Sequence, residues 1–243
     1  MSNSDHQRCW AIVCAAGSGR RMEMDIPKQY LPLKNSTVLE ESLSCFLHHP
    51  QIAGVVVALH ADDHRWPSLE ISTDPRVQNV VGGDTRARSV VNALERVRSL
   101  AEQEDFVLVH DAARPCLGYE DLDRLITEGL GGEDGVILAS PVHDTVKQVR
   151  ASDGAQEVER TLDRSLLWKA LTPQMFRVGV LHKALQFCIE NDREVTDDAS
   201  AVEAIGQPVR MIRGRSDNIK VTRPEDIQLA ESILLHVSKS SHN

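Results

Sequence analysis

The chain lacks the features that mark several large classes of protein. No apolar stretch in its 243 residues approaches the length of a membrane span. The polar residues 1–8, which we expect to be flexible, have no apolar centre like that of a signal peptide. The net charge of -9 leaves no excess of cations for a nonspecific nucleic-acid surface. Aromatic residues form 4% of the chain, and the tryptophans are too scattered for a base-stacking platform. We therefore expect neither a membrane nor a nucleic-acid partner.

The spacing of metal ligands is also absent. The five cysteines are scattered, odd in number and without a Cys-x-x-Cys pair, so neither a zinc site nor a disulfide framework is indicated. The ten histidines show no metal spacing either. His48 and His49 precede Pro50 at an expected helix end, where the helix dipole explains them. We expect no metal ligands from the protein and a cytoplasmic location.

The order of apolar segments predicts a single α/β domain over residues 9–237, followed by a flexible tail at 238–243. Runs typical of buried strands alternate with runs of helical periodicity. The expected strands are 9–14, 54–59, 77–81, 106–109, 135–139 and 218–221, and the expected helices are 37–47, 87–100, 119–130 and 225–237. Such alternation implies right-handed crossovers and a doubly wound, mostly parallel sheet.

One polar segment, residues 143–169, interrupts this alternation. Its short apolar alternation is confined to Thr145-Val146-Lys147-Gln148-Val149, so it would bury little surface of its own. We expect an extended arm or hairpin, inserted into the domain, that packs on a second subunit. Exchanged arms of this kind are a common route to a symmetric homodimer. A mobile surface loop is the alternative.

Three clusters of small and polar residues, at 15–21, 82–89 and 110–114, each follow an expected strand. In doubly wound sheets, ligands bind beyond the carboxyl ends of the strands. The three clusters are therefore expected to converge on one edge of the sheet and to form a single site.

The glycine-rich loop after the first strand suits a polyanion. It consists of Ala15-Ala16-Gly17-Ser18-Gly19-Arg20-Arg21-Met22 and is followed by Pro27-Lys28-Gln29-Tyr30. Arg20 and Arg21 stand where a P-loop has Lys-Ser or Lys-Thr, and Met22 stands where the dinucleotide fingerprint needs Gly or Ala. With Lys28, three cations lie within reach of the loop. This pattern indicates an enzyme that holds a nucleoside triphosphate and reacts at its phosphorus. A glycine-rich turn with two solvated arginines is the alternative.

Motifs spread over residues 9–235 resemble those of one enzyme family. They are the two motifs above, Gly82-Gly83-Asp84, His110-Asp111-Ala112-Ala113-Arg114-Pro115, Asp144-Thr145-Val146-Lys147, Leu171-Thr172-Pro173-Gln174, Thr196-Asp197-Asp198-Ala199-Ser200 and Asn218-Ile219-Lys220-Val221-Thr222-Arg223-Pro224-Glu225-Asp226. The chain resembles the 2-C-methyl-D-erythritol 4-phosphate cytidylyltransferases of the non-mevalonate isoprenoid pathway, which implies a Rossmann-like nucleotidyltransferase fold. Cys14 stands where the family usually has proline, which predicts a less rigid strand exit.

The resemblance implies that the 4-phosphate of methylerythritol attacks the α-phosphorus of CTP and that pyrophosphate leaves. Attack of one anion on another requires charge neutralisation and in-line alignment. Two alternatives remain: a cytidylyltransferase for another polyol phosphate, such as ribitol 5-phosphate, and a noncatalytic nucleotide-binding subunit. The noncatalytic alternative predicts lost cations, whereas Arg21, Lys28, Arg164 and Lys220 are all present.

These four cations are the catalytic residues that the resemblance implies. Arg21 and Lys28 would stabilise the transition state at the α-phosphate. Arg164 and Lys220 would orient the attacking phosphate, and the planar fork of arginine suits that task. The plain alternatives are an exposed loop lysine for Lys28 and a surface ion pair with Asp163 or Glu159 for Arg164.

The implied nucleotide site joins backbone donors to small side chains. The matching positions are Ala15, Ala16, Gly17, Ser18, Gly19, Arg20, Gly83, Asp84, Ser89 and Ala112. The glycines and Ser18 would donate backbone N–H groups to the phosphates, and Arg20 either assists the triphosphate or faces solvent. For Asp84 and Ser89, capping of the helix at 87–100 is the alternative.

The acceptor side is implied at Asp111, Arg114, Thr145, Thr172 and Thr196. Mg²⁺ is expected to be held chiefly by the CTP phosphates and water, because magnesium keeps several waters. Asp111 would act through that water shell or on substrate hydroxyls, and pairing with Arg114 is its structural alternative. His110 is expected to buttress the strand end. Since Thr145 and Arg164 lie in the arm, an exchanged arm would give active sites shared between subunits.

Overall fold

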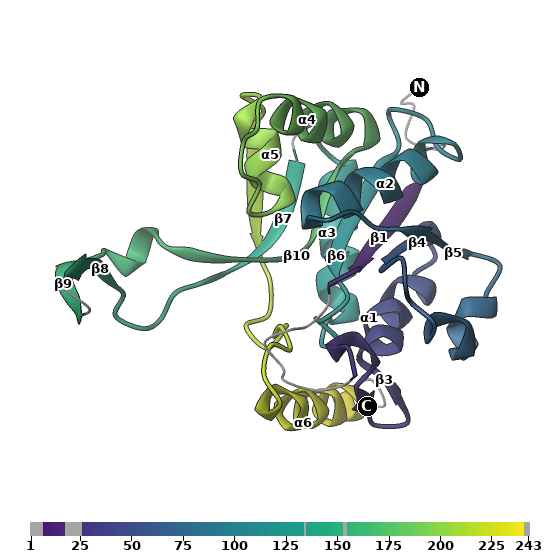
Figure 1. Ribbon diagram of the computed structural model, residues 1–243, viewed down its shortest axis with the longest axis horizontal. Helices are drawn as coiled ribbons and strands as arrows, with labels where there is room; N and C mark the ends of the chain where they lie inside the picture. Colours follow the sequence, from purple (N-terminus) through teal and green to yellow (C-terminus); the bar gives the residue numbers. More distant parts are fainter. Residues whose placement is uncertain (1–6, 18–25, 134, 153–154, 241–243) are drawn as a thin grey trace.

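A seven-stranded sheet forms the centre of the molecule in this computed structural model, which describes residues 7–17, 26–133, 135–152 and 155–240 (Figure 1). The strand order is β11-β7-β10-β6-β1-β4-β5. In chain order the strands are β1 (Cys9–Ala15), β4 (Ile52–Leu59), β5 (Val77–Val81), β6 (Phe106–Asp111), β7 (Gly135–Pro141), β10 (Trp168–Arg177) and β11 (Val209–Arg213). β10 is antiparallel to β6 and β7, and the other neighbouring pairs are parallel. The predicted mostly parallel sheet is confirmed.

Helices cover both faces of the sheet, as the doubly wound fold requires. The first face packs against α1 (Val38–Leu47) and α3 (Tyr119–Leu130). The second packs against α2 (Arg86–Arg98), α4 (Val178–Glu190) and α5 (Asp198–Ala204). β1 is buried on both sides: Ala11 and Val13 belong to the first apolar cluster, and Ile12 to the second. Side chains alternate across a strand, so this two-sided burial explains the continuous apolar run in the sequence.

A smaller apolar cluster lies beneath α6 (Glu225–Ser240). It joins Leu33 and Val38 to Val221 and Ala230. The short strands β2 (Pro32–Leu33) and β3 (Ser36–Thr37) and the 3₁₀ turn η3 (Lys28–Tyr30) lie in the same part of the chain. Two further 3₁₀ turns, η4 (Trp66–Ser68) and η5 (Glu70–Thr73), precede β5. The cluster fixes the chain on both sides of Lys28 and Lys220.

The prediction of a strand at 218–221 is wrong. This segment is anchored by individual contacts rather than by a ladder. Val221 donates its N–H to the Ala113 carbonyl at 2.8 Å, and the buried Asn218 amide donates to the Thr172 carbonyl at 2.8 Å. The apolar residues that suggested a strand instead cover the loop after β6.

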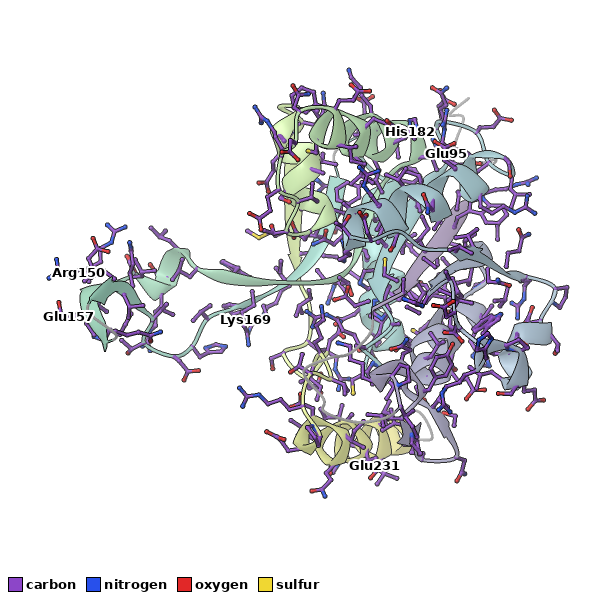
Figure 2. The ribbon with its side chains drawn as sticks, in the orientation of Figure 1. Glu95, Arg150, Glu157, Lys169, His182 and Glu231 are labelled. Carbon is purple, nitrogen blue, oxygen red and sulfur yellow. The ribbon has the colours of Figure 1, made fainter. Side chains whose placement is uncertain are left out.

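The polar segment forms an arm that projects away from the sheet (Figure 1). Its outer part is an antiparallel hairpin of β8 (Lys147–Ser152) and β9 (Ala155–Thr161), followed by the 3₁₀ turn η6 (Arg164–Leu166). Figure 2 shows Arg150 and Glu157 at the end of the arm and Lys169 nearer the sheet. The hairpin exposes apolar side chains, and Leu166 is 79% exposed. Within the described segments, no helix has the length and apolar character needed to cross a membrane.

Candidate active site

A cavity of about 310 Å³ lies at the carboxyl ends of β1 and β6, beside the loop after β5. Its size falls at the lower end of the range for small-molecule sites. It is lined by Cys14, Ala15, Ala16, Gly17, Lys28, Gln29, Gly83, Asp84, Thr85, Arg86, Ser89, Asp111, Ala112, Ala113 and Lys220. The three sequence clusters thus converge on one cavity, as predicted. Ser18, Gly19, Arg20 and Arg21 lie outside the described residues.

The first wall of the cavity is the end of β1 and the turn η3. The buried Gln29 amide donates to the Ala15 carbonyl at 2.8 Å, which fastens η3 to the carboxyl end of β1. This contact places Lys28 at the cavity, where its ammonium donates to the Val221 carbonyl at 3.4 Å. Lys28 is therefore part of the site rather than an exposed loop lysine.

The second wall is the loop between β5 and α2. Thr85 caps α2 by accepting the Arg88 N–H, so the capping alternative for Ser89 is wrong. The buried Ser89 hydroxyl instead accepts the Gly83 N–H at 3.0 Å and donates to the Thr85 carbonyl at 2.9 Å. Asp84 is largely exposed and pairs with Arg88 at 3.3 Å. Ser89 therefore sets the shape of the loop that faces the cavity.

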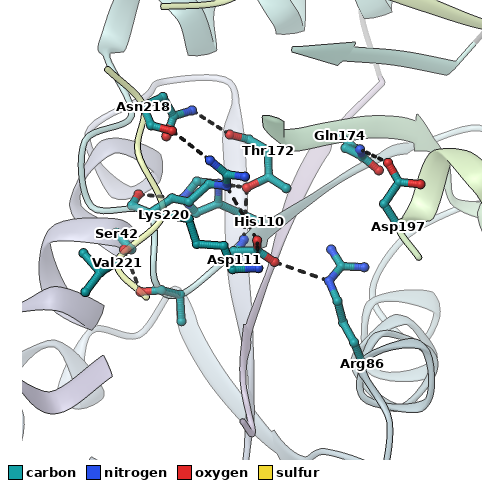
Figure 3. A network of polar contacts seen from close by, with 12 residues as sticks. Ser42, Arg86, His110, Asp111, Thr172, Gln174, Asp197, Asn218, Lys220 and Val221 are labelled. Atoms are coloured by element: carbon teal, nitrogen blue, oxygen red, sulfur yellow. Dashed lines mark hydrogen bonds and ion pairs between the residues drawn. The ribbon is translucent and has the colours of Figure 1, made fainter. Parts of the chain in front are cut away.

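Asp111, at the end of β6, lies among three cations, of which Figure 3 labels Arg86 and Lys220. The Lys220 ammonium lies 2.7 Å from its carboxylate, the Arg86 Nε 3.3 Å and the Arg114 Nε 3.6 Å. Burial by itself would raise the pKa of Asp111, but the charges of Arg86, Lys220 and Arg114 outweigh burial and hold the pKa well below its ordinary value. Asp111 is ionised at neutral pH. With Lys28 nearby, cations outnumber carboxylates, which suits a polyanionic ligand.

His110 supports this arrangement from inside the fold. Its Nε2–H donates to the Arg114 carbonyl at 3.0 Å, which leaves Nδ1 to accept the Thr172 hydroxyl at 2.9 Å. The Thr172 oxygen accepts the Asp111 N–H at 3.2 Å. Burial lowers the pKa of His110 from 6.5 to about 4, so the ring is neutral at pH 7. His110 thus supports the end of β6 through these two contacts, as the sequence suggested.

The remaining predicted residues divide into two groups. Arg114 and Thr172 adjoin Asp111, and the Arg114 guanidinium also donates to the Asn218 carbonyl at 2.8 Å. Thr145, Arg164 and Thr196 are not among the residues that line the described cavity; Thr196 is exposed ahead of α5, and the other two lie on the arm. Arg164 donates to the His143 carbonyl at 2.5 Å.

Three residues that shape the site have no role that was predicted from the sequence. Arg86 lines the cavity and bridges two carboxylates, while Gln29 and Asn218 are buried amides that fasten loops to the sheet. Gln29 and Asn218 stood inside recognised motifs without an assigned role. Arg86 follows Gly82-Gly83-Asp84 by two positions, which was its only sequence signal.

At the carboxyl ends of its strands, this doubly wound sheet carries a cavity that is lined by small residues and surrounded by cations. This is the arrangement of a nucleotidyltransferase. The matching family is 2-C-methyl-D-erythritol 4-phosphate cytidylyltransferase, whose pattern covers residues 9–236. This chain belongs to that family.

Named relatives and solved structures agree with this membership. The enzyme of that name from Pseudomonas fluorescens (strain SBW25) is 54% identical over 220 residues, which is 90% of this chain and 92% of that protein. The one from Pseudomonas putida (strain GB-1) is 53% identical over the same share of each chain. A crystal structure of 4-diphosphocytidyl-2C-methyl-D-erythritol synthase superposes with a TM-score of 0.80 at 38% identity, covering 94% of this chain and 99% of the other. The Francisella tularensis cytidylyltransferase gives 0.79 at 34% identity, covering 93% and 100%.

Proposed function

We propose that this protein transfers a cytidylyl group from CTP to 2-C-methyl-D-erythritol 4-phosphate in isoprenoid precursor synthesis. The products are 4-diphosphocytidyl-2-C-methyl-D-erythritol and pyrophosphate. The observation that carries the proposal is the ionised Asp111, which lines the cavity and is held among Lys220, Arg86 and Arg114. The names of its relatives do not favour a ribitol phosphate enzyme or a noncatalytic subunit.

The reaction requires the charge of two phosphates to be neutralised while they are brought into line. Lys28 lines the cavity and, with Arg21, would stabilise the negative charge that develops at the α-phosphate. Lys220, fixed by Asp111 at 2.7 Å, would orient the attacking phosphate. The attacking phosphate is already anionic, so the neutral His110 is not required as a base.

Mg²⁺ would enter this site with the nucleotide. Bound to the phosphates, it supplies further neutralisation of their charge. Among the described residues there is no group of three or more side chains arranged to hold a metal ion. Asp111 is already engaged by cations, so its donor oxygens fit an outer contact through water rather than direct coordination. The proposal therefore assigns Mg²⁺ chiefly to the CTP phosphates and water.

Two subunits would complete each active site. The arm carries Thr145 and Arg164 away from the cavity of its own chain and exposes apolar side chains, both of which support a homodimer with exchanged arms. Mixing two inactive variants, Arg164→Ala and Lys220→Ala, tests this proposal. In a mixed dimer one site contains both native residues, so random exchange would restore about a quarter of wild-type activity. No recovery after verified subunit exchange would contradict shared sites.

The activity itself is tested by pyrophosphate release with CTP and Mg²⁺, using methylerythritol 4-phosphate and ribitol 5-phosphate in parallel. We expect release with the first acceptor only. Release with ribitol 5-phosphate alone would move the protein to another pathway, and CTP binding without release would revive the noncatalytic alternative. A cytoplasmic location is also proposed; the five cysteines are all free, which suits a reducing compartment.

A further inference from the structure

A buried carboxylate outside the cavity, Asp198, lies at the start of α5. It is 0% exposed, and its Oδ1 has no hydrogen-bond partner among the described residues. Burying an ionised carboxylate is costly unless a specific partner compensates it. Helix capping does not explain its position, because the neighbouring Asp197 already caps α5 by accepting the Ser200 N–H at 2.9 Å. Asp198 therefore has another role.

The partner of Asp198 is Arg86, which projects from the first turn of α2. The Arg86 Nη2 lies 2.7 Å from Asp198 Oδ2, and its Nε lies 3.3 Å from Asp111 Oδ1. One guanidinium thus spans the distance between a carboxylate inside the fold and a carboxylate in the cavity. Burial would lower the pKa of Arg86, but the neighbouring groups, Asp198 foremost and Asp111 among the others, raise it well above its ordinary value, so the bridge stays charged.

The start of α5 is itself fixed to the central sheet. Gln174 of β10 donates its amide to Asp197 at 2.8 Å (Figure 3). Its amide oxygen also accepts the Ala199 N–H at 2.9 Å. Gln174 pairs with Val109 of β6, the strand that ends at Asp111. The residues on both sides of Asp198 are thus tied to the central sheet through the Gln174 side chain.

We propose that Asp198 is a positioning residue for the cytidylyl transfer. It keeps the Arg86 guanidinium from pairing fully with Asp111, so that Asp111 stays paired with Lys220 and Lys220 stays oriented toward the acceptor phosphate. This role rests on the proposed function. The charges alternate along the row from Asp198 through Arg86 and Asp111 to Lys220. Without the Asp198 charge, both N–H edges of the Arg86 guanidinium can bind the Asp111 carboxylate, because arginine prefers bidentate pairing with a carboxylate. Asp111 would then turn from Lys220, and the acceptor phosphate would lose its oriented cation.

Steady-state kinetics of Asp198→Asn, run with both substrates varied, tests the role. We expect the KM for methylerythritol 4-phosphate to rise about 10-fold or more, the range for a hydrogen bond to a charged group. The KM for CTP should change by about twofold or less, which is the deviation expected between sites that do not interact. Glu203→Gln is the matched control: it also removes one carboxylate charge from α5, but the Glu203 side chain is exposed and does not touch Arg86, so its constants should stay near those of wild type.

A double-mutant cycle with Arg86→Gln separates positioning from a general structural role. If Asp198 acts through Arg86, adding Asp198→Asn to Arg86→Gln should change kcat/KM by about twofold or less. Additive losses would overturn the proposal, as would wild-type acceptor KM in Asp198→Asn. Thermal unfolding of every variant checks that the fold is retained.

Arg86→Lys keeps the proposal testable if Asp198→Asn does not fold. A lysine ammonium reaches one carboxylate but cannot bridge two, so the same rise in acceptor KM is expected. An unchanged acceptor KM in that variant would overturn the bridge. Failure of the proposed function is a separate outcome, because it would be seen as absent pyrophosphate release in wild type and in the Glu203→Gln control alike.

Discussion

The buried neutral His110 predicts how the stability of this protein depends on pH. Its pKa falls from 6.5 to about 4 on folding because the ring is removed from water. Between these values the unfolded chain binds a proton at His110 and the folded chain does not, so acid favours unfolding. The free energy of unfolding should therefore rise with pH through this window and level off above it. A shift of that size corresponds to about 3 kcal/mol between the two ends.

His110→Gln isolates this contribution. The glutamine amide can still donate to the Arg114 carbonyl, but it has no basic nitrogen to titrate. Urea unfolding of both proteins at intervals from pH 4.5 to pH 7 should show a steeper rise in wild type, by up to about 1.4 kcal/mol per pH unit. Asp198, whose pKa burial raises, acts in the opposite direction, but it is present in both proteins and cancels in the difference.

An equal slope in the two proteins would refute the reasoning. NMR of the imidazole provides a direct check that needs no variant. The His110 ring signals should remain those of the Nε2–H tautomer from pH 7 to pH 5, since Nε2 faces a carbonyl and Nδ1 accepts a hydroxyl. Protonation near pH 6.5 would show that the ring is not desolvated as the structure has it.

Four further substitutions, one of them a control, test the nucleotide and acceptor sides of the site. Lys28→Ala should lower turnover about 10²- to 10³-fold, the usual effect of removing one electrostatic stabiliser, while thermal unfolding stays near that of wild type; near-native turnover would remove Lys28 from the mechanism. Gly83→Ala would place a Cβ 2.4 Å from the Arg88 Cβ, so both stability and CTP affinity should fall. Gly17→Ala is the control, because its added Cβ meets nothing within 4 Å and should leave stability unchanged. Calorimetry and CTP titration compare the two variants, and equal melting temperatures would contradict the clash. Arg164→Lys should raise the acceptor KM or lower turnover because a point charge cannot replace a bidentate fork, and unchanged kinetics would exclude Arg164 from the site.

Much of the sheet was predictable because its strands are buried on both faces. The continuous apolar runs at 54–59 and 106–109 are found within β4 and β6. β10 was missed because Pro173 interrupts its apolar pattern and its register shifts between Ala170 and Gln174. The seven-residue α5 was missed because it is too short for helical periodicity to show.

The site was predictable where its residues follow strands, and not where its contacts are long-range. Ala15, Gly83 and Asp111 could be placed at one edge because carboxyl ends of parallel strands meet there. The role of Arg86 depends on carboxylates 25 and 112 positions away, and no local pattern contains such a relation. Gln29, Asp198 and Asn218 lie within recognised motifs, but the contacts by which they hold the site are found only in the folded chain.

Asp111 and Asp198 also explain how several cations can lie close together in the protein without a bound nucleotide. Arg86, Arg114 and Lys220 would repel one another in the free protein, and Asp111 offsets that repulsion while Asp198 holds Arg86 at a fixed distance. A neutral residue at 111 would remove one repulsive charge from the path of the phosphates, which by itself favours binding. It would also release the cations from their positions. Because electrostatic catalysis depends on groups that are already oriented when charge develops, the loss of order should outweigh the gain in attraction.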